Sequence, residues 1–216
     1  MNRRITAVLT ALVALALVLG GCSSSGSHPA SRPKGSDLND NSGGTFLGAG
    51  LDPGQPRPQF TLTDTAGKPF SFGQQTAKQP TMLYFGYTQC PDVCPETMAD
   101  IRLALSKVSP AVAKQTWVVF VSTDVQHDTG PVIAQWLGTL RGHAPGHWVG
   151  LRGTQAEIDA AQAAAHVTVA EDGGQTHSAQ TLLYGPDDLA HVTFLESSNE
   201  QQQIAHDLPL VAKGTT

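Results

Sequence analysis

The amino-acid sequence predicts an α/β fold in which a mixed central sheet is flanked by helices and preceded by an N-terminal hairpin. Two continuous apolar runs, at residues 81–87 and 116–122, are typical of strands that are buried on both faces. Each run is followed by a segment whose apolar residues recur at helical spacing. The length of 216 residues, with 40% hydrophobic and 14% charged residues, suits one globular domain rather than two.

The hairpin is expected at the start of the folded part, which we place at residues 59–216. Residues 60–63 alternate between apolar and polar side chains, as in a half-buried strand. Residues 64–68 (DTAGK) contain the residue types of a tight turn, and residues 70–72 would form the returning strand.

The helices that connect the strands are predicted from spacing and capping signals. Met98, Ile101 and Leu105 lie at helical spacing and indicate a helix over residues 95–108. Thr154 and Glu157 form a capping box, which marks the start of another helix. The remaining elements are expected, in chain order, as a helix at 131–140, a strand at 148–151, the capped helix through about residue 165, strands at 178–184 and 189–194, and a last helix at 199–208 that Pro209 would end.

This alternation of strands and helices implies that the two buried strands pair in parallel through crossover helices. A thioredoxin-like fold fits the order well. The order of elements does not by itself define the chemistry, which has to come from particular residues.

The N-terminus carries the pattern of a secretory signal. Arg3 and Arg4 precede an almost wholly apolar run at residues 5–19. As a helix this run would be roughly 22 Å long, which is short of the roughly 30 Å hydrocarbon core of a membrane, so a membrane-spanning helix is the weaker interpretation. The two arginines are a weak export signal, and the sequence leaves both the general and the twin-arginine export routes open.

The end of the apolar run resembles a bacterial lipoprotein box. Leu19, Gly20 and Gly21 directly precede Cys22, which would become the lipidated first residue of the mature chain. An ordinary signal peptide followed by an unrelated cysteine is the alternative. We expect residues 1–21 to be the lipoprotein signal peptide.

Residues 22–58 are rich in Ser, Gly and Pro and would form a flexible, lipid-anchored tether. The sequence therefore predicts a protein that is attached to the cell membrane by its lipid and faces the extracytoplasmic side.

The composition excludes several functions. Lys and Arg number 13 against 18 Asp and Glu, and the acidic body has no basic stripe, so we expect no nucleic-acid partner. Three cysteines are too few for a disulfide-rich scaffold, and no C-x-x-C-H motif for c-type haem is present. We expect the protein to be a monomer.

Two cysteines follow the first buried strand at a spacing that suits a disulfide bond or a shared metal ion. Cys90 and Cys94 close a short loop, and Pro95 suits the first position of the helix that follows. Two sulfurs in such a loop can form a disulfide or share one metal ion, and a helix N-terminus favours the thiolate form. The alternative is a disulfide that only stabilises an exported protein.

A metal site needs a further ligand, and His177 is the candidate that the sequence favours. It ends a polar, flexible loop at residues 171–176 and begins a predicted strand, and ligand sites in α/β folds lie near such loops. The alternatives among the eight histidines are His127 and the pair His143 and His147 in a Gly/Pro loop.

The segment from Phe85 to Pro95 (FGYTQCPDVCP), with His177 downstream, closely resembles the SCO/SenC family of copper-binding, thioredoxin-like proteins. The resemblance runs from about residue 60 to the final helix. It implies that Cys90, Cys94 and His177 bind copper as Cu(I) and Cu(II). It also implies a role in assembly of the copper A centre of cytochrome c oxidase.

One segment departs from the family's usual pattern, Ser-x-Asp-Pro-x-Arg-Asp-Thr. Asp124 and Asp128 are kept, whereas Val125 and His127 replace the proline and the arginine. This leaves the metal ligands untouched and puts partner docking or loop rigidity in doubt. We expect Asp124 and Asp128, together with Asp92, to surround the metal ligands.

The leading hypothesis is therefore a copper metallochaperone that passes copper to the copper A subunit, with another copper chaperone as a conceivable donor. Zn²⁺ accepts the same ligands, and only the resemblance favours copper. The alternatives are a thiol–disulfide reductase, in which Cys90 and Cys94 are the redox-active pair that keeps the copper A cysteines reduced, and a redox or copper sensor.

Overall fold

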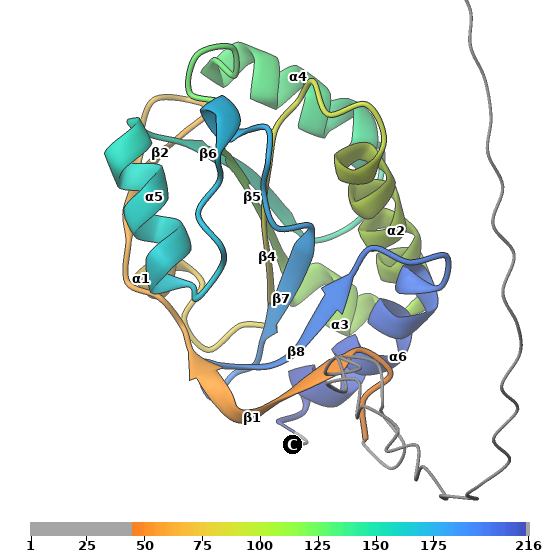
Figure 1. The fold of residues 1–216 in the computed structure, drawn as a ribbon. Helices are drawn as coiled ribbons and strands as arrows, with labels where there is room; N and C mark the ends of the chain where they lie inside the picture. The colour runs from red at the N-terminus through yellow and green to blue at the C-terminus, as the bar shows by residue number, and fades with distance from the viewer. Residues whose placement is uncertain (1–44, 215–216) are drawn as a thin grey trace, which may run out of the picture. The chain divides into compact units, whose positions relative to one another are not determined.

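The computed structural model describes residues 45–214, which form one mixed eight-stranded sheet with helices on both faces (Figure 1). The strands lie in the order β1-β8-β7-β4-β5-β6-β2-β3. In chain order the strands are β1 (Ala49–Pro56), β2 (Thr61–Asp64), β3 (Pro69–Ser71), β4 (Thr81–Gly86), β5 (Trp117–Ser122), β6 (His147–Arg152), β7 (Gln180–Tyr184) and β8 (Leu189–Leu195). The helices are α1 (Phe72–Gln75), α2 (Val93–Lys107), α3 (Pro110–Gln115), α4 (Gly130–Arg141), α5 (Gln155–Ala164) and α6 (Glu200–Ala212), with a short 3-10 turn, η1 (Asp172–Gly174).

The centre of the sheet confirms the prediction from the two apolar runs. Strands β4 and β5 pair in parallel, β5 and β6 do the same, and the other neighbouring strands are antiparallel. The α/β class, the mixed sheet and the thioredoxin-like arrangement are thereby confirmed. The predicted hairpin is also present, because β2 pairs with β3 and extends the sheet at the β6 edge.

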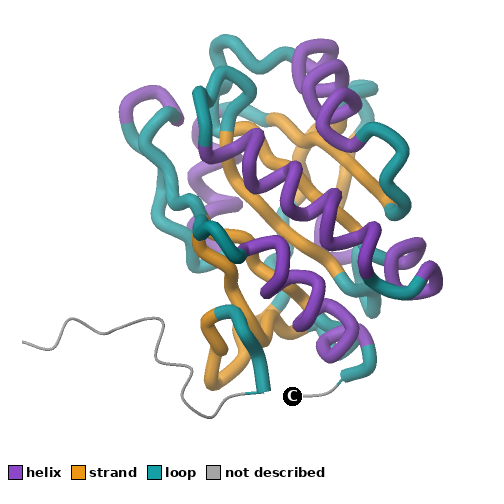
Figure 2. The backbone as a smooth tube through the Cα atoms, turned by 90° about the vertical axis from the view of Figure 1, so that its right-hand side faces the viewer, coloured by secondary structure: helices purple, strands orange, loops and turns teal. Residues whose placement is uncertain are grey.

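Successive residues of β4 point to opposite faces of the sheet, and each face has its own hydrophobic cluster. Met82 and Tyr84 belong to the cluster that α2 and α6 cover, whereas Leu83 and Phe85 belong to the one that α5 covers. Figure 1 shows α5 and α1 on one side of the sheet and α2, α3 and α6 on the other, and Figure 2 shows the helices of this second side crossing in front of the strands. Burial on both faces explains why β4 reads as an unbroken apolar run.

Helix α2 begins before the predicted start at Pro95. Its first residue is Val93, and Asp92 is the N-cap, whose carboxylate accepts the main-chain N–H of Val93 at 2.7 Å. Pro95 therefore lies within the first turn, where its missing N–H would have no partner inside the helix in any case. As a consequence Cys94 is part of the helix rather than of the loop.

The folded part of the chain begins before residue 59, so the predicted tether, which was to reach residue 58, is too long. Strand β1 pairs with β8 over Ala49–Pro56, although its sequence is rich in Gly and Pro. Main-chain pairing holds it there rather than apolar side chains, and this is why composition did not reveal it.

Two buried charged side chains fix the ends of β1. Asp207 of α6 is fully buried and accepts the main-chain N–H groups of Leu47 and Gly48 at 2.9 and 2.8 Å. Arg57 follows the strand, donates to Asp188 at 2.9 Å, and lies over the ring of Tyr184 at 5.0 Å.

Helix α6 continues through Pro209 to Ala212, whereas the sequence predicted its end at residue 208. Ile204, Leu208 and Val211 lie on one face and are completely buried in the same cluster as α2. The burial of this apolar face offsets the cost of a proline within the helix.

The predicted lipoprotein signal at 1–21, the predicted lipidation site Cys22 and the first part of the predicted tether lie outside the described residues. Within residues 45–214, none of the helices is both long enough and apolar enough to cross a membrane.

Candidate metal centre

The two cysteines lie where strand β4 passes into helix α2. Cys90 is in the connecting loop and is partly exposed, whereas Cys94 is in the first turn of the helix and is fully buried. The main-chain N–H of Cys94 donates to the sulfur of Cys90 at 3.4 Å, so the turn itself holds the two cysteines together. No disulfide joins them in this structure.

His177 approaches the cysteines from the other side. Its Nε2 lies 3.5 Å from the sulfur of Cys94. The ligand atoms of Cys90, Cys94 and His177 all lie within 4.8 Å of one another, and among residues 45–214 this is the one cluster of Cys, His, Asp and Glu side chains with that property. The structure thus brings together the three residues predicted as metal ligands.

The imidazole of His177 presents a free lone pair to the cysteines. Its Nδ1 lies 3.2 Å from the main-chain carbonyl oxygen of Ser178, which can only accept a hydrogen bond, so Nδ1 is the protonated nitrogen. Nε2 then carries the lone pair, which faces Cys94. Burial lowers the pKa of His177, which favours this neutral form.

Burial also changes the expected state of Cys94. It raises the pKa of the Cys94 thiol to about 12, although the hydrogen bond from Tyr84 acts in the opposite direction. The sequence predicted that the helix N-terminus would favour the thiolate form. For Cys94 in the metal-free protein this prediction is wrong, because its raised pKa favours the neutral thiol. Desolvation of the buried sulfur is the largest cause of this shift. A bound cation would reverse the balance, because metal coordination deprotonates a thiol.

Strand β4 supplies the floor of the site. The hydroxyl of Tyr84 donates to the sulfur of Cys94 at 3.5 Å, and a Cβ at Gly86 would lie 2.8 Å from that same sulfur. Only glycine leaves room for the sulfur at this point. Neither residue was predicted from the sequence to belong to the site, although a buried tyrosine hydroxyl before a cysteine loop needs a hydrogen-bond partner and could have been a signal.

The carboxylate of Asp128 fixes the beginning of the cysteine loop. It accepts the main-chain N–H of Thr88 at 3.0 Å and the hydroxyls of Thr88 and Ser122. Asp128 is 1% exposed. It therefore holds the loop after β4 against the end of β5.

Thr123 performs the corresponding task for the loop before His177. Its hydroxyl donates to the carbonyl oxygen of Gly174 at 2.6 Å, and its main-chain N–H donates to the carbonyl oxygen of Gly86 at 2.8 Å. Gly174 has a φ of +95°, and a Cβ there would lie 2.0 Å from the carbonyl oxygen of Thr123. The loop that carries His177 can approach the sheet this closely because residue 174 is a glycine.

Asp92 and Asp124, the other two aspartates predicted near the ligands, bind main-chain groups rather than the cysteine sulfurs. Asp92 caps helix α2 through the N–H of Val93. Asp124 accepts the main-chain N–H groups of Gln126 and His127 and contacts His127 Nδ1 at 2.8 Å. These contacts stabilise the helix start and the turn after β5, so Asp92 and Asp124 act on the backbone that carries the site.

The alternative histidines do not join the cluster. His127 is engaged with Asp124, and His147 stacks on Trp117 with ring centroids 4.7 Å apart. His143 is exposed in the loop before β6. Neither these three histidines nor any other described histidine meets both cysteines in the way that His177 does.

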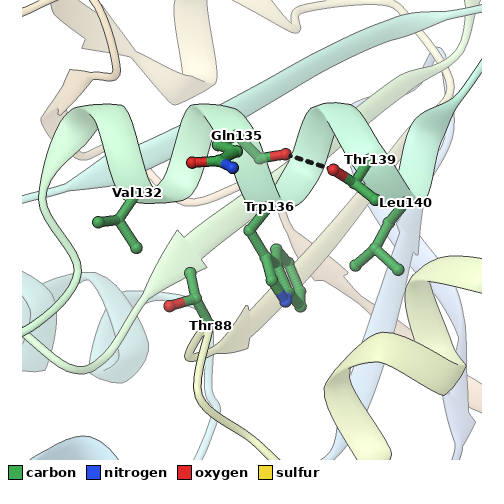
Figure 3. A pocket seen from close by; sticks show the side chains of 6 residues that line it. All are labelled: Thr88, Val132, Gln135, Trp136, Thr139 and Leu140. Atoms are coloured by element: carbon green, nitrogen blue, oxygen red, sulfur yellow. Dashed lines mark hydrogen bonds between the residues drawn. The ribbon is translucent and has the colours of Figure 1, made fainter.

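An apolar pocket of about 340 Å³ lies beside the cysteine loop (Figure 3). Thr88 of the loop faces Val132, Trp136 and Leu140 of helix α4 across it. The Trp136 ring packs on Phe120 with centroids 4.8 Å apart. The cysteine loop therefore borders an apolar pocket whose opposite wall is helix α4.

The arrangement permits two kinds of chemistry. Two sulfurs and one imidazole nitrogen form a soft donor set that suits Cu(I), serves Cu(II) through the nitrogen, and is also acceptable to Zn²⁺. The two sulfurs alone can form a disulfide, with the partly exposed Cys90 accessible to another protein.

A thioredoxin-like fold with two cysteines at the start of α2 and a histidine before β7 defines a narrow class of proteins. Residues 50–213 match the sequence profile described as SCO1/SenC. The chain belongs to the SCO1/SenC family, and the resemblance seen in the sequence is confirmed.

Individual relatives agree with this assignment. Protein SenC of Rhodobacter capsulatus is 30% identical over 164 residues, which cover 73% of this chain and 71% of SenC. The solution structure of apo Sco1 from Thermus thermophilus is 25% identical, with a TM-score of 0.64 over 76% of this chain and 96% of that one. ScoI of Bradyrhizobium japonicum, solved with copper bound, is 29% identical, with a TM-score of 0.58 over 73% of this chain and 98% of that one. The chain spans less than two thirds of the length of several other curated relatives, including 64% of one from Stutzerimonas stutzeri.

We expect Gly174→Ala to lower the free energy of unfolding by about 1–3 kcal/mol, because the new Cβ meets the carbonyl oxygen of Thr123 and the residue has a positive φ. Urea unfolding measures this loss, and hydrogen exchange should speed up at residues 171–177. Gly173→Ala is the matched control, since Gly173 also has a positive φ but has nothing within 4 Å of its would-be Cβ. Equal losses in the two variants would show that the close approach at Gly174 is unimportant.

Proposed function

We propose that the protein is a copper chaperone, which binds copper through Cys90, Cys94 and His177 and delivers it to the copper A centre of cytochrome c oxidase. The observation that carries the proposal is the convergence of these three side chains within 4.8 Å in a member of the SCO1/SenC family. A family member that is 29% identical has been solved with copper bound. The oxidase as the acceptor is inferred from the family resemblance.

The donor set suits a cargo that changes its oxidation state. Thiolate sulfur favours Cu(I), and imidazole nitrogen serves both Cu(I) and Cu(II). The neutral His177 offers its Nε2 without losing a proton, whereas the buried thiol of Cys94 must release its proton when a metal binds. Copper is the substrate of this reaction, and the protein's task is to hold it and then release it.

The different exposure of the two cysteines suits release to a partner. Cys94 is fully buried beneath the loop, whereas Cys90 is partly exposed. A thiol of the acceptor can therefore reach the metal from the side of Cys90, while Cys94 and His177 still hold it. Cys90 would be the first ligand to be exchanged.

The proposal includes a place for the protein in the cell. The lipoprotein box at Cys22 implies that a lipid anchors the chain to the extracytoplasmic side of the cell membrane. The partners would be the copper A subunit as the acceptor and another copper chaperone as the donor. The protein would act as a monomer.

A second candidate function, thiol–disulfide reductase, is favoured by the same difference in exposure. The thiolate of Cys90 would attack a disulfide of the copper A subunit, form a mixed disulfide and release one thiol of that subunit. Cys94 would then attack the Cys90 sulfur, release the second thiol and leave a Cys90–Cys94 disulfide. Two electrons pass from this protein to the partner.

The two functions differ in what the acceptor gains. The reduced, copper-loaded protein should transfer its copper to a metal-free copper A domain with reduced cysteines, and the acceptor should develop the absorption of a copper A site. The metal-free, reduced protein should be mixed with an oxidised copper A domain as the second arm. Reduction of the disulfide without copper transfer in the first arm would favour the reductase, and the absence of both reactions would refute both functions.

We expect His177→Ala to lose Cu(II) binding much more than Cu(I) binding. The two remaining thiolates satisfy Cu(I), whereas Cu(II) prefers nitrogen and a fuller set of ligands. Competition with chelators for each oxidation state measures the two affinities. His127→Ala is the control and should bind both ions as the wild type does, because His127 contacts Asp124 instead of the cysteines. Unchanged Cu(II) binding in His177→Ala would exclude His177 as a ligand.

The anchoring step predicts a modified N-terminus. Mass spectrometry of the mature protein should find Cys22 as the first residue with a lipid attached to it. Cys22→Ser should keep an uncleaved or soluble form of the chain. A mature protein that retains Met1, or one that carries an unmodified Cys22, would contradict the lipoprotein assignment.

A further inference from the structure

Tyr84 lies beneath the metal centre and contacts two of its three residues. Its hydroxyl donates to the sulfur of Cys94 at 3.5 Å, and its ring meets the His177 ring edge-on with centroids 6.1 Å apart. The same ring stacks with Phe120, with centroids 6.4 Å apart. The position of Tyr84 on the central strand β4 makes it part of the rigid floor of the site.

The hydroxyl of Tyr84 has little choice of partner. The residue is 1% exposed, so the hydroxyl cannot turn to water without disturbing the core. A phenol hydroxyl carries its proton at neutral pH, so Tyr84 acts as the donor in its contact with the sulfur of Cys94. The sulfur of Cys94 accepts from this hydroxyl at 3.5 Å, and the side chain of Thr97 is its other polar neighbour.

The two sulfurs receive different kinds of hydrogen bond. Cys90 accepts the main-chain N–H of Cys94 at 3.4 Å, which any residue at position 94 other than proline would provide. Cys94 accepts a side-chain hydroxyl, which depends on the identity of residue 84. A substitution can therefore remove the hydrogen bond at one sulfur and leave the other intact.

We propose that Tyr84 is a positioning residue whose hydroxyl stays hydrogen-bonded to the Cys94 sulfur when copper is bound, and that it thereby shifts the site toward Cu(I). The inference rests on the proposed copper site at Cys90, Cys94 and His177. A thiolate ligand keeps lone pairs that can accept a hydrogen bond, and an ionised acceptor forms a stronger bond than a neutral one.

The direction of the effect follows from the charge on sulfur. A hydrogen bond to the sulfur withdraws electron density from it, so the sulfur donates less to the metal. Cu(II) depends on that donation more than Cu(I) does, and hydrogen bonding around a cysteine ligand is known to tune copper sites in this way. Removal of the hydroxyl should therefore favour Cu(II).

Tyr84→Phe is the direct test, because phenylalanine keeps the ring that packs on Phe120 and loses only the hydroxyl. We expect the ratio of Cu(I) affinity to Cu(II) affinity to fall by about threefold to tenfold, the effect of losing one ordinary hydrogen bond, because the bond is lost in both oxidation states and only the difference changes the ratio. The sulfur-to-Cu(II) charge-transfer absorption should move to longer wavelength, since a more strongly donating sulfur needs less energy for that transition. Chelator competition and absorption spectra of the full mature protein provide the two readouts.

Tyr184→Phe is the matched control. Tyr184 is equally buried, but it lies on the opposite face of the sheet, and its hydroxyl has no hydrogen-bond partner among the described residues. This variant loses the same group, and its affinity ratio and charge-transfer band should equal those of the wild type. A general effect of removing a buried hydroxyl would change both variants.

The outcomes separate this inference from the function on which it rests. A wild-type protein that binds no copper refutes the proposed function. A wild-type protein that binds copper, with the same affinity ratio and absorption band in Tyr84→Phe, refutes the role of Tyr84 alone. A purely structural role would change the stability of Tyr84→Phe without moving the charge-transfer band.

A measurement on the unmodified protein covers the case in which Tyr84→Phe does not fold. The hydroxyl proton of Tyr84 should be visible by NMR in the reduced protein because it is buried, and its resonance should move when Cu(I) is added. A hydroxyl proton that exchanges as fast as one on an exposed tyrosine, or a resonance that does not respond to Cu(I), would refute the proposed hydrogen bond.

Discussion

The rest of the site depends on the burial of the Cys94 side chain, whose sulfur packs against the end of β4. This burial requires a residue without a side chain at Gly86, a helix that begins early enough to turn the cysteine inward, and a loop whose main chain aligns the second sulfur. The same burial makes the metal-free thiol neutral. A bound metal ion would therefore stabilise the thiolate of Cys94, because it places a positive charge beside the buried sulfur.

The sequence predicted those parts of the molecule that depend on local patterns. Strands β4 and β5 were recognisable because burial on both faces requires unbroken apolar runs, and the capped start of α5 because Thr154 and Glu157 satisfy each other's main-chain groups. Cys90, Cys94 and His177 were recognisable because few residue types can bind a soft metal. Helix α6 extends beyond its predicted end because the burial of Val211 offsets the cost of Pro209 within the helix. That burial is a property of the tertiary structure.

The features that the sequence could not supply depend on contacts between distant segments. Strand β1 has no apolar pattern and is held by pairing with β8 and by Asp207, which is far away in the chain. The neutral state of Cys94 reflects the whole packed core around the sulfur rather than the nearby helix terminus. A buried tyrosine hydroxyl before the cysteine loop signals that it needs a partner, but the packing of β4 against the first turn of α2 identifies the sulfur of Cys94 as that partner.

The turn after β5 separates residues that hold the main chain from residues that shape the surface. Asp124 accepts main-chain N–H groups of the turn, and Asp128 ties the turn to the loop after β4. Both aspartates match the family's usual pattern, whereas Val125 and His127 occupy the positions that differ from it. Val125 packs against the cluster on the α5 side of the sheet, whereas the imidazole of His127 is half-exposed and touches the protein through Asp124. Position 127 is therefore the place in this turn where a protein engineer could change the surface beside the site without touching Cys90, Cys94 or His177.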